Sequence, residues 1–139
     1  MMVLEGAPAL SSFRRERLQA RLQAIHADLR LLGAWWVYWV DADPGQTPDA
    51  GALHRILQAN AGAAPREAGA VSRYVTPRLG TLSPWASKAT ELLRGAGQPV
   101  HRVERGVRYD LAGWPADAAT QTALAKVLHD PMTQSVLDT

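Results

Sequence analysis

The feature that most constrains the fold is an order of strand-like and helix-like segments that occurs twice along the chain. Runs of apolar, β-branched or alternating residues, which are typical of strands, occupy residues 1–5, 34–40, 70–76 and 100–111. Each is followed by a segment typical of a helix, at residues 11–33, 47–57, 83–94 and 115–128. This order predicts an α+β fold in which helices cover an antiparallel sheet.

The two halves of the chain, about residues 1–64 and 65–139, can be aligned at the starts of their first helices. Residues 10–13, Leu-Ser-Ser-Phe, match residues 82–85, Leu-Ser-Pro-Trp, 72 positions later. Each half holds two strands and two helices, which are too few to bury both faces of its own sheet. We therefore expect one domain over residues 1–139, in which the halves join their sheets about a pseudo-twofold axis with helices on one side.

In the first half, Ser11 or Ser12 is expected to cap a long helix that ends at Gly33, a natural left-handed stop. Its inward stripe would be Leu18, Leu22, Ile25 and Leu29. The next strand would place Trp36, Tyr38 and Val40 on one face, with Trp35, Val37 and Trp39 on the other. Thr47 and Pro48 are expected to start a short helix, and residues 60–65 form the expected loop between the halves.

In the second half, Ser83 and Pro84 are expected to start a helix that runs to about Arg94. Residues 100–111 predict a strand or hairpin with Gly106 as its bend or bulge. Pro115 is expected to open the last helix, with Leu124, Val127 and Leu128 inward. Residues 130–131, Asp-Pro, would then cap and restart a final turn over residues 132–137.

Composition excludes several classes of protein. The chain has no cysteine, which excludes a disulfide scaffold, a thiolate metal site and a cysteine nucleophile. Its 15 basic and 13 acidic side chains give a net charge of only +2, which favours neither nucleic acid nor an anionic membrane as a partner. No apolar run is long enough to span a membrane, and no secretion signal is present, so we expect a cytoplasmic protein.

The residues also predict no catalytic, cofactor-binding or metal-binding set. The four histidines, His26, His54, His101 and His129, lack the close spacing of metal ligands. The serines lie at helix starts, outside any G-x-S-x-G elbow, and Gly95 and Gly97 close a helix instead of opening a phosphate loop. The series Arg14, Arg15, Arg17 and Arg21 leaves RNA binding open, although these side chains are expected to cover the edge of the core.

Residues 75–90, V-T-P-R-L-G-T-L-S-P-W-A-S-K-A-T, contain more donors than a plain strand-to-helix connection needs. Two prolines, a glycine, an arginine, a lysine and five hydroxyl groups surround one tryptophan. Such a segment is typical either of a surface that meets polar groups of a partner or of a well-capped loop.

This segment resembles the signature near the start of the large, single-chain phosphoribosylformylglycinamidine synthases, also called FGAM synthetases or FGAR amidotransferases. Residues 6–13, 103–107 and 128–133 agree with the same family in the same order. The resemblance implies an N-terminal domain built from two PurS-like repeats with pseudo-twofold symmetry. The parent enzyme is a ligase of purine biosynthesis that uses ATP, magnesium and glutamine.

The resemblance further implies that this domain holds no cofactor, is inactive alone, bridges the synthetase and glutaminase regions and helps to shape the ammonia route. The implied contacts to those regions are Thr76, Arg78, Ser83, Trp85, Lys88 and Arg105. The isolated chain is also expected to self-associate through its Trp-rich strand and its missing partner surface. A regulatory α+β module that binds a small molecule such as a nucleotide is the alternative.

Overall fold

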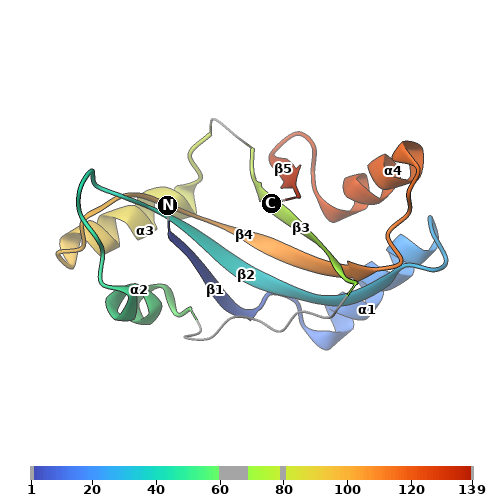
Figure 1. The fold of residues 1–139 in the computed structure, drawn as a ribbon, viewed down its shortest axis with the longest axis horizontal. Coiled ribbons are helices and arrows are strands. Elements are labelled where there is room, and N and C mark those ends of the chain that lie inside the picture. Colours follow the sequence, from blue (N-terminus) through green and yellow to red (C-terminus); the bar gives the residue numbers. More distant parts are fainter. Residues whose placement is uncertain (1, 60–68, 79–80, 139) are drawn as a thin grey trace.

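The computed structural model describes residues 2–59, 69–78 and 81–138, and these residues confirm the α+β class (Figure 1). Strands and helices alternate from the first strand to the last. In chain order they are β1 (Met2–Pro8), α1 (Ser12–Gln23), β2 (Arg30–Ala42), α2 (Ala50–Leu57), β3 (Val71–Pro77), α3 (Pro84–Gly95), β4 (Val100–Ala112), α4 (Ala118–Leu128) and β5 (Gln134–Leu137).

The strands form one antiparallel sheet in the order β1-β2-β4-β3-β5. The long strands β2 and β4 pair along nearly their whole length, from Arg30 opposite Ala112 to Ala42 opposite Val100. The Trp-rich strand β2 is therefore internal, with β1 on its other side. The order β1-β2-β4-β3 is compatible with two equivalent halves, whereas β5 has no counterpart among the described residues, and the pseudo-twofold symmetry stays a prediction.

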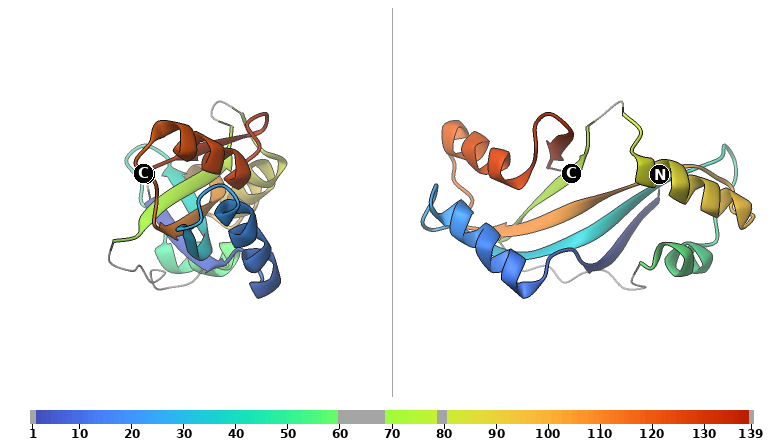
Figure 2. Two further views of the ribbon diagram at one scale, coloured as in Figure 1. Left: turned by 90° about the vertical axis from the view of Figure 1, so that its right-hand side faces the viewer. Right: turned by 180° about the vertical axis from the view of Figure 1, so that it is seen from behind.

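The helices form two pairs at opposite ends of the sheet, with α1 beside α4 and α2 beside α3 (Figures 1 and 2). Both pairs pack on the same face, because Ala34 contacts the first pair while Tyr38 and Val40, at even spacing on the same strand, contact the second. Two core clusters result. One contains Leu4, Tyr38, Val40, Leu53, Leu57, Ala89, Leu93, Val100 and Val103, and the other contains Leu22, Leu29, Leu31, Ala34, Val75, Tyr109, Leu111, Leu124 and Leu128.

The opposite face of the sheet carries a buried ion cluster. Tyr109 and Leu111 belong to the core of the α1–α4 pair, so Arg108 and Asp110, which alternate with them, point the other way. Both are buried, and Arg108 contacts Glu5 of β1 as well as Asp110. The sheet therefore has an apolar helix-covered face and a face that buries charge.

The predicted end of the first helix is wrong. Helix α1 ends at Gln23, residues 30–33 belong to β2, and Ile25 is 40% exposed. Pairing of β2 with β4 as far as Arg30 fixes residues 30–33 as strand, and this tertiary pairing overrides their helical periodicity. The side chain of Gln19 accepts from the backbone N–H of Leu31, which fastens the start of β2 to α1.

Two further helix starts also differ from the prediction. Helix α2 is capped by Asp49 and not by Thr47, because the Asp49 carboxylate accepts from the backbone N–H of Gly51 at 3.1 Å. Helix α4 is capped by Asp117, two residues after Pro115, and its carboxylate accepts from the backbone N–H of Thr120 at 2.9 Å. Aspartate supplies a charged acceptor at both starts, which is favourable at the positive end of a helix.

The roles of Gly106 and of residues 134–137 were also predicted incorrectly. Strand β4 runs through Gly106 without a bulge, and the register of β2 with β4 shifts instead at residues 31–33 of β2 and at residues 100–102 of β4. Residues 134–137 form β5, because Val136 and its neighbours pair with β3 instead of continuing a helical turn. The predicted loop at residues 60–65 and the boundary between the halves lie outside the described residues.

Candidate functional site

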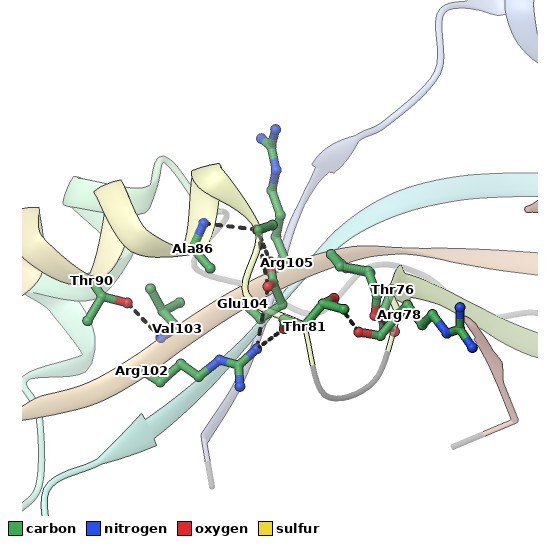
Figure 3. A network of polar contacts seen from close by, with 11 residues as sticks. Thr76, Arg78, Thr81, Ala86, Thr90, Arg102, Val103, Glu104 and Arg105 are labelled. Carbon is green, nitrogen blue, oxygen red and sulfur yellow. Dashed lines mark hydrogen bonds and ion pairs between the residues drawn. The ribbon is translucent and has the colours of Figure 1, made fainter. Parts of the chain in front are cut away.

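The start of α3 is fixed to strand β4 through Ser83. The Ser83 hydroxyl group accepts from the backbone N–H of Ala86 at 3.0 Å, which makes Ser83 the predicted N-cap. The same hydroxyl group donates to the Glu104 carboxylate at 3.0 Å, and Glu104 also accepts from the backbone N–H of Arg105 at 3.0 Å. Figure 3 shows this network between α3 and β4. Ser83 therefore serves the internal structure.

Thr76 and Arg78 hold the connection that leads to α3. Thr76 is buried, and its hydroxyl group donates to the carbonyl oxygen of Pro77 at 3.0 Å. The backbone N–H of Arg78 donates to the carbonyl oxygen of Thr133 at 2.8 Å, and the Arg78 carbonyl oxygen accepts from Thr81. Most hydroxyl groups of the signature segment thus bond within the chain, as expected for a well-capped loop (Figure 3).

Trp85, Lys88 and Arg105 meet at one hollow of about 480 Å³ beside the α2–α3 pair. Trp36 and Tyr38 of β2 line the same hollow. The central carbon of the Arg105 guanidinium lies 4.6 Å from the centre of the Trp36 ring and 4.8 Å from that of Trp85. The side chain of Arg105 extends away from the Ser83–Glu104 network (Figure 3). We call this site the Arg105 hollow.

The electrostatics of the Arg105 hollow are those of a cationic, aromatic site. Burial raises the pKa of Tyr38, and the nearby positive charge of Arg105 partly offsets that rise. None of the described residues that line the hollow is acidic. Ala7, Ile56, Leu57, Gln58, Ala89 and Leu92 complete its described lining. A guanidinium beside aromatic rings, with an ammonium group nearby, can bind an oxyanion.

A smaller hollow of about 270 Å³ lies between α1 and α4. Arg14, Arg17 and Arg21 line it together with Tyr109. These arginines thus lie at the edge of the core, as predicted, and the Arg17 guanidinium lies 5.7 Å from the centre of the Phe13 ring. The RNA-binding alternative receives no further support from this arrangement.

Over residues 2–59, 69–78 and 81–138, no group of three His, Asp or Glu side chains is placed to hold a metal ion. None of the helices in these ranges is both long and apolar enough to cross a membrane. His54 lies on α2, where its Nδ1 atom is buried without a hydrogen bond in the described structure.

Sequence reasoning missed two features of these sites. Trp36 and Tyr38 were predicted to share a face of their strand, but not to meet Trp85 and Arg105, because that contact depends on the pairing of β2 with β4. The buried Arg108 cluster was also missed. Its signal is the alternation of two charged residues with apolar and aromatic ones at the end of the predicted strand, over residues 107–111, V-R-Y-D-L.

A comparison with models of protein families finds one that matches residues 35–139 and is described as the N-terminal region of formylglycinamide ribonucleotide amidotransferase. The match begins in β2 and continues through β5. It includes all six residues predicted to contact other regions, as well as Trp36 and Tyr38 of the Arg105 hollow.

Proposed function

The chain belongs to the formylglycinamide ribonucleotide amidotransferase N-terminal family, and from this premise we propose that it is the non-catalytic assembly domain of that purine-biosynthetic enzyme. In this role it bridges the synthetase and glutaminase regions and helps to shape the route of ammonia between them. The observation that carries the proposal is the match over residues 35–139, which covers most of the sheet and three of the helices.

The residues of the chain fit an assembly role better than a catalytic one. A glutaminase that works through a cysteine nucleophile cannot reside here, because the sequence contains no cysteine. A site for ATP with magnesium is also unsupported: the described residues lack a cluster of carboxylates, and Gly97 follows the end of α3 and not the start of a helix. We therefore assign ATP, magnesium and both reactions to the remaining regions of the enzyme.

The contribution of this domain would be to hold those regions in place. Ammonia must be kept from bulk water and protons if it is to remain a nucleophile, so a protected route needs closely packed walls. Two exposed apolar side chains are suited to such packing: Leu82, just before α3, and Leu92, on α3. Among the six predicted contacts, Trp85, Lys88 and Arg105 gather at one hollow beside this helix, whereas Thr76 is buried and Ser83 caps α3.

The test is to produce the remaining regions separately and to compare two ammonia sources. We expect the chain alone to hydrolyse neither glutamine nor ATP. Adding it should restore product formation from glutamine more than product formation from ammonium chloride, since only the first requires an intact route. Hydrolysis of glutamine or ATP by the purified chain, or equal stimulation with both sources, would contradict the proposal.

The alternative is a regulatory module that binds a nucleotide, and the Arg105 hollow is the observation that favours it. The volume of the hollow, about 480 Å³, lies in the range of ligand sites, and its aromatic walls and two cations suit a base and a phosphate group. Calorimetry of the isolated chain with purine nucleotides separates the two functions. Micromolar binding would favour the regulatory module.

A further inference from the structure

Among the described residues Arg105 has no carboxylate partner, whereas three other arginines have one. Arg94 pairs with Asp43, Arg102 with Glu104, and Arg108 with both Glu5 and Asp110. Within the described part of the chain, no hydrogen bond or ion pair reaches the guanidinium of Arg105, which lies against the rings of Trp36 and Trp85. Contact with a ring face leaves the N–H donors of a guanidinium available.

The neighbouring carboxylate is already engaged elsewhere. Glu104 lies next to Arg105, but its carboxylate accepts from Ser83 and from the Arg105 backbone N–H, and it pairs with Arg102 at 3.8 Å. Successive residues of a strand point to opposite faces, so the side chains of Glu104 and Arg105 diverge. A carboxylate that neutralises Arg105 must therefore come from another source.

The lining of the hollow indicates which groups should accompany that carboxylate. Lys88 follows Trp85 by one helical turn and adds a second positive charge to the same side of α3. Leu92, which lies one turn further on and is 60% exposed, provides an apolar wall. Tryptophan and arginine are also the residues that most often dominate the binding energy of protein interfaces. The site thus combines an anion subsite with an apolar subsite.

We propose that the Arg105 hollow receives an acidic side chain from the remaining regions of the enzyme, with an apolar neighbour of that side chain against Trp85 and Leu92. The carboxylate accepts from the free N–H edge of Arg105 and lies near the Lys88 ammonium group. This inference rests on the proposed assembly function and adds the chemistry of the partner surface. Removing the arginine leaves the partner carboxylate desolvated and unpaired, which is the costly case for an interface.

The first experiment measures the dissociation constant of the complex between the chain and the separately produced remaining regions. Arg105→Gln should weaken binding at least about tenfold and reduce its salt dependence. Arg105→Lys should recover part of the loss, because it restores the charge without the flat fork of donors. The matched control is Arg55→Gln, which removes an exposed arginine of α2 that does not line the hollow. Circular dichroism of each variant confirms folding.

The second experiment identifies the occupant by zero-length cross-linking. A carbodiimide joins a lysine amine to a carboxylate in direct contact, and the chain has only two lysines. We expect Lys88 to be joined to an aspartate or glutamate of the remaining regions. Lys126, on α4 at the other end of the sheet, is the internal control and should not form that link. Peptide mass spectrometry identifies both products.

The outcomes separate this inference from the proposed function. If the complex forms but Arg105→Gln binds like Arg55→Gln and Lys88 is not joined to a carboxylate, the inference is wrong and the assembly function stands. If the unchanged chain forms no complex, both are wrong. Micromolar binding of a purine nucleotide that is lost in Arg105→Gln would also overturn the inference, because the hollow would then be a nucleotide site.

Discussion

The guanidinium of Arg108 donates to both carboxylate oxygens of Asp110, from Nε to Oδ1 at 3.0 Å and from Nη2 to Oδ2 at 2.9 Å. The two residues lie two positions apart on β4, which places them on the same face of the strand. The third guanidinium nitrogen donates to Glu5 at 2.7 Å, and the Ser72 hydroxyl group donates to Asp110 at 2.8 Å. This cluster links β1, β4 and β3, and Arg108 within it has no exposed surface.

Asp110→Asn is expected to lower the free energy of unfolding by about 3–5 kcal/mol, because it leaves the buried charge of Arg108 without its bidentate partner. Urea denaturation measures the loss. The control is Asp43→Asn, whose ion pair with Arg94 is partly exposed and should contribute at most about 1 kcal/mol. Equal losses of unfolding free energy in the two variants would show that burial of the Arg108 cluster does not determine its contribution to stability.

Gly106→Ala should destabilise the sheet by about 1–3 kcal/mol or prevent folding, because an added Cβ atom forces neighbouring groups to move. That atom would lie 2.3 Å from the carbonyl oxygen of Val75 and 2.9 Å from the Trp39 ring. Gly95→Ala is the control, since nothing lies within 4 Å of its added Cβ atom. Thermal unfolding of both variants tests the prediction, and a Gly106→Ala protein as stable as the Gly95→Ala protein would refute it.

Ser83→Ala should cost about 1–2 kcal/mol, because it removes the N-cap of α3. It also removes the hydrogen bond to Glu104. Ser87→Ala, in the same helix but not at the cap, should change stability by no more than about 0.5 kcal/mol. Chemical denaturation compares the two. Equal losses of stability in the two variants would contradict the role of Ser83 as the N-cap of α3.

The stability of the chain should fall below about pH 4 in part through Asp117. Hydrogen bonds from the Thr120 hydroxyl group and backbone N–H lower the pKa of the Asp117 carboxyl group from its ordinary value of 3.8. The folded state therefore binds this proton less readily than the unfolded state. The stabilisation by these hydrogen bonds is present at pH values above 3.8, the ordinary pKa. It is lost as the pH falls through the lower pKa of the folded state.

A carboxyl-carbon NMR titration measures that pKa directly. Thr120→Val removes the hydroxyl donor and should move the pKa of Asp117 back toward 3.8. In urea denaturation, the stability difference between the unchanged chain and Asp117→Asn should shrink as the solution is acidified. A pKa at or above 3.8 in the unchanged chain would contradict the capping geometry.

Local signals predicted helix α3 most closely. Ser83 and Pro84 form a cap and first turn that need no distant residue, so the start of the helix could be located from the sequence alone. The end of α1 and the strand at residues 134–137 could not be located in this way. Both depend on pairing with strands far away in the sequence, which overrides local periodicity.

In the candidate site, too, some features could be predicted from local sequence and others depend on distant strand pairing. Trp85, Lys88 and Arg105 were identified through the resemblance of two short motifs, and the structure brings all three to one hollow. The contact of Arg105 with Trp36 follows from the register that sets Trp36 opposite Val107, and no local rule fixes that register. The expected self-association of the isolated chain stays a prediction. The Trp-rich strand β2 is internal and cannot provide the contact, so the exposed apolar side chains elsewhere, such as Leu82 and Leu92, are now the reason to expect it.

Sedimentation velocity of an equimolar mixture of this chain and the separately produced remaining regions tests the assembly role most directly. The assembly role predicts one boundary that contains both components and moves faster than either alone. Arg105→Gln should reduce the fraction of protein in that boundary, and Arg55→Gln should not. Two independent boundaries at micromolar concentration, with both components folded, would contradict the assembly role.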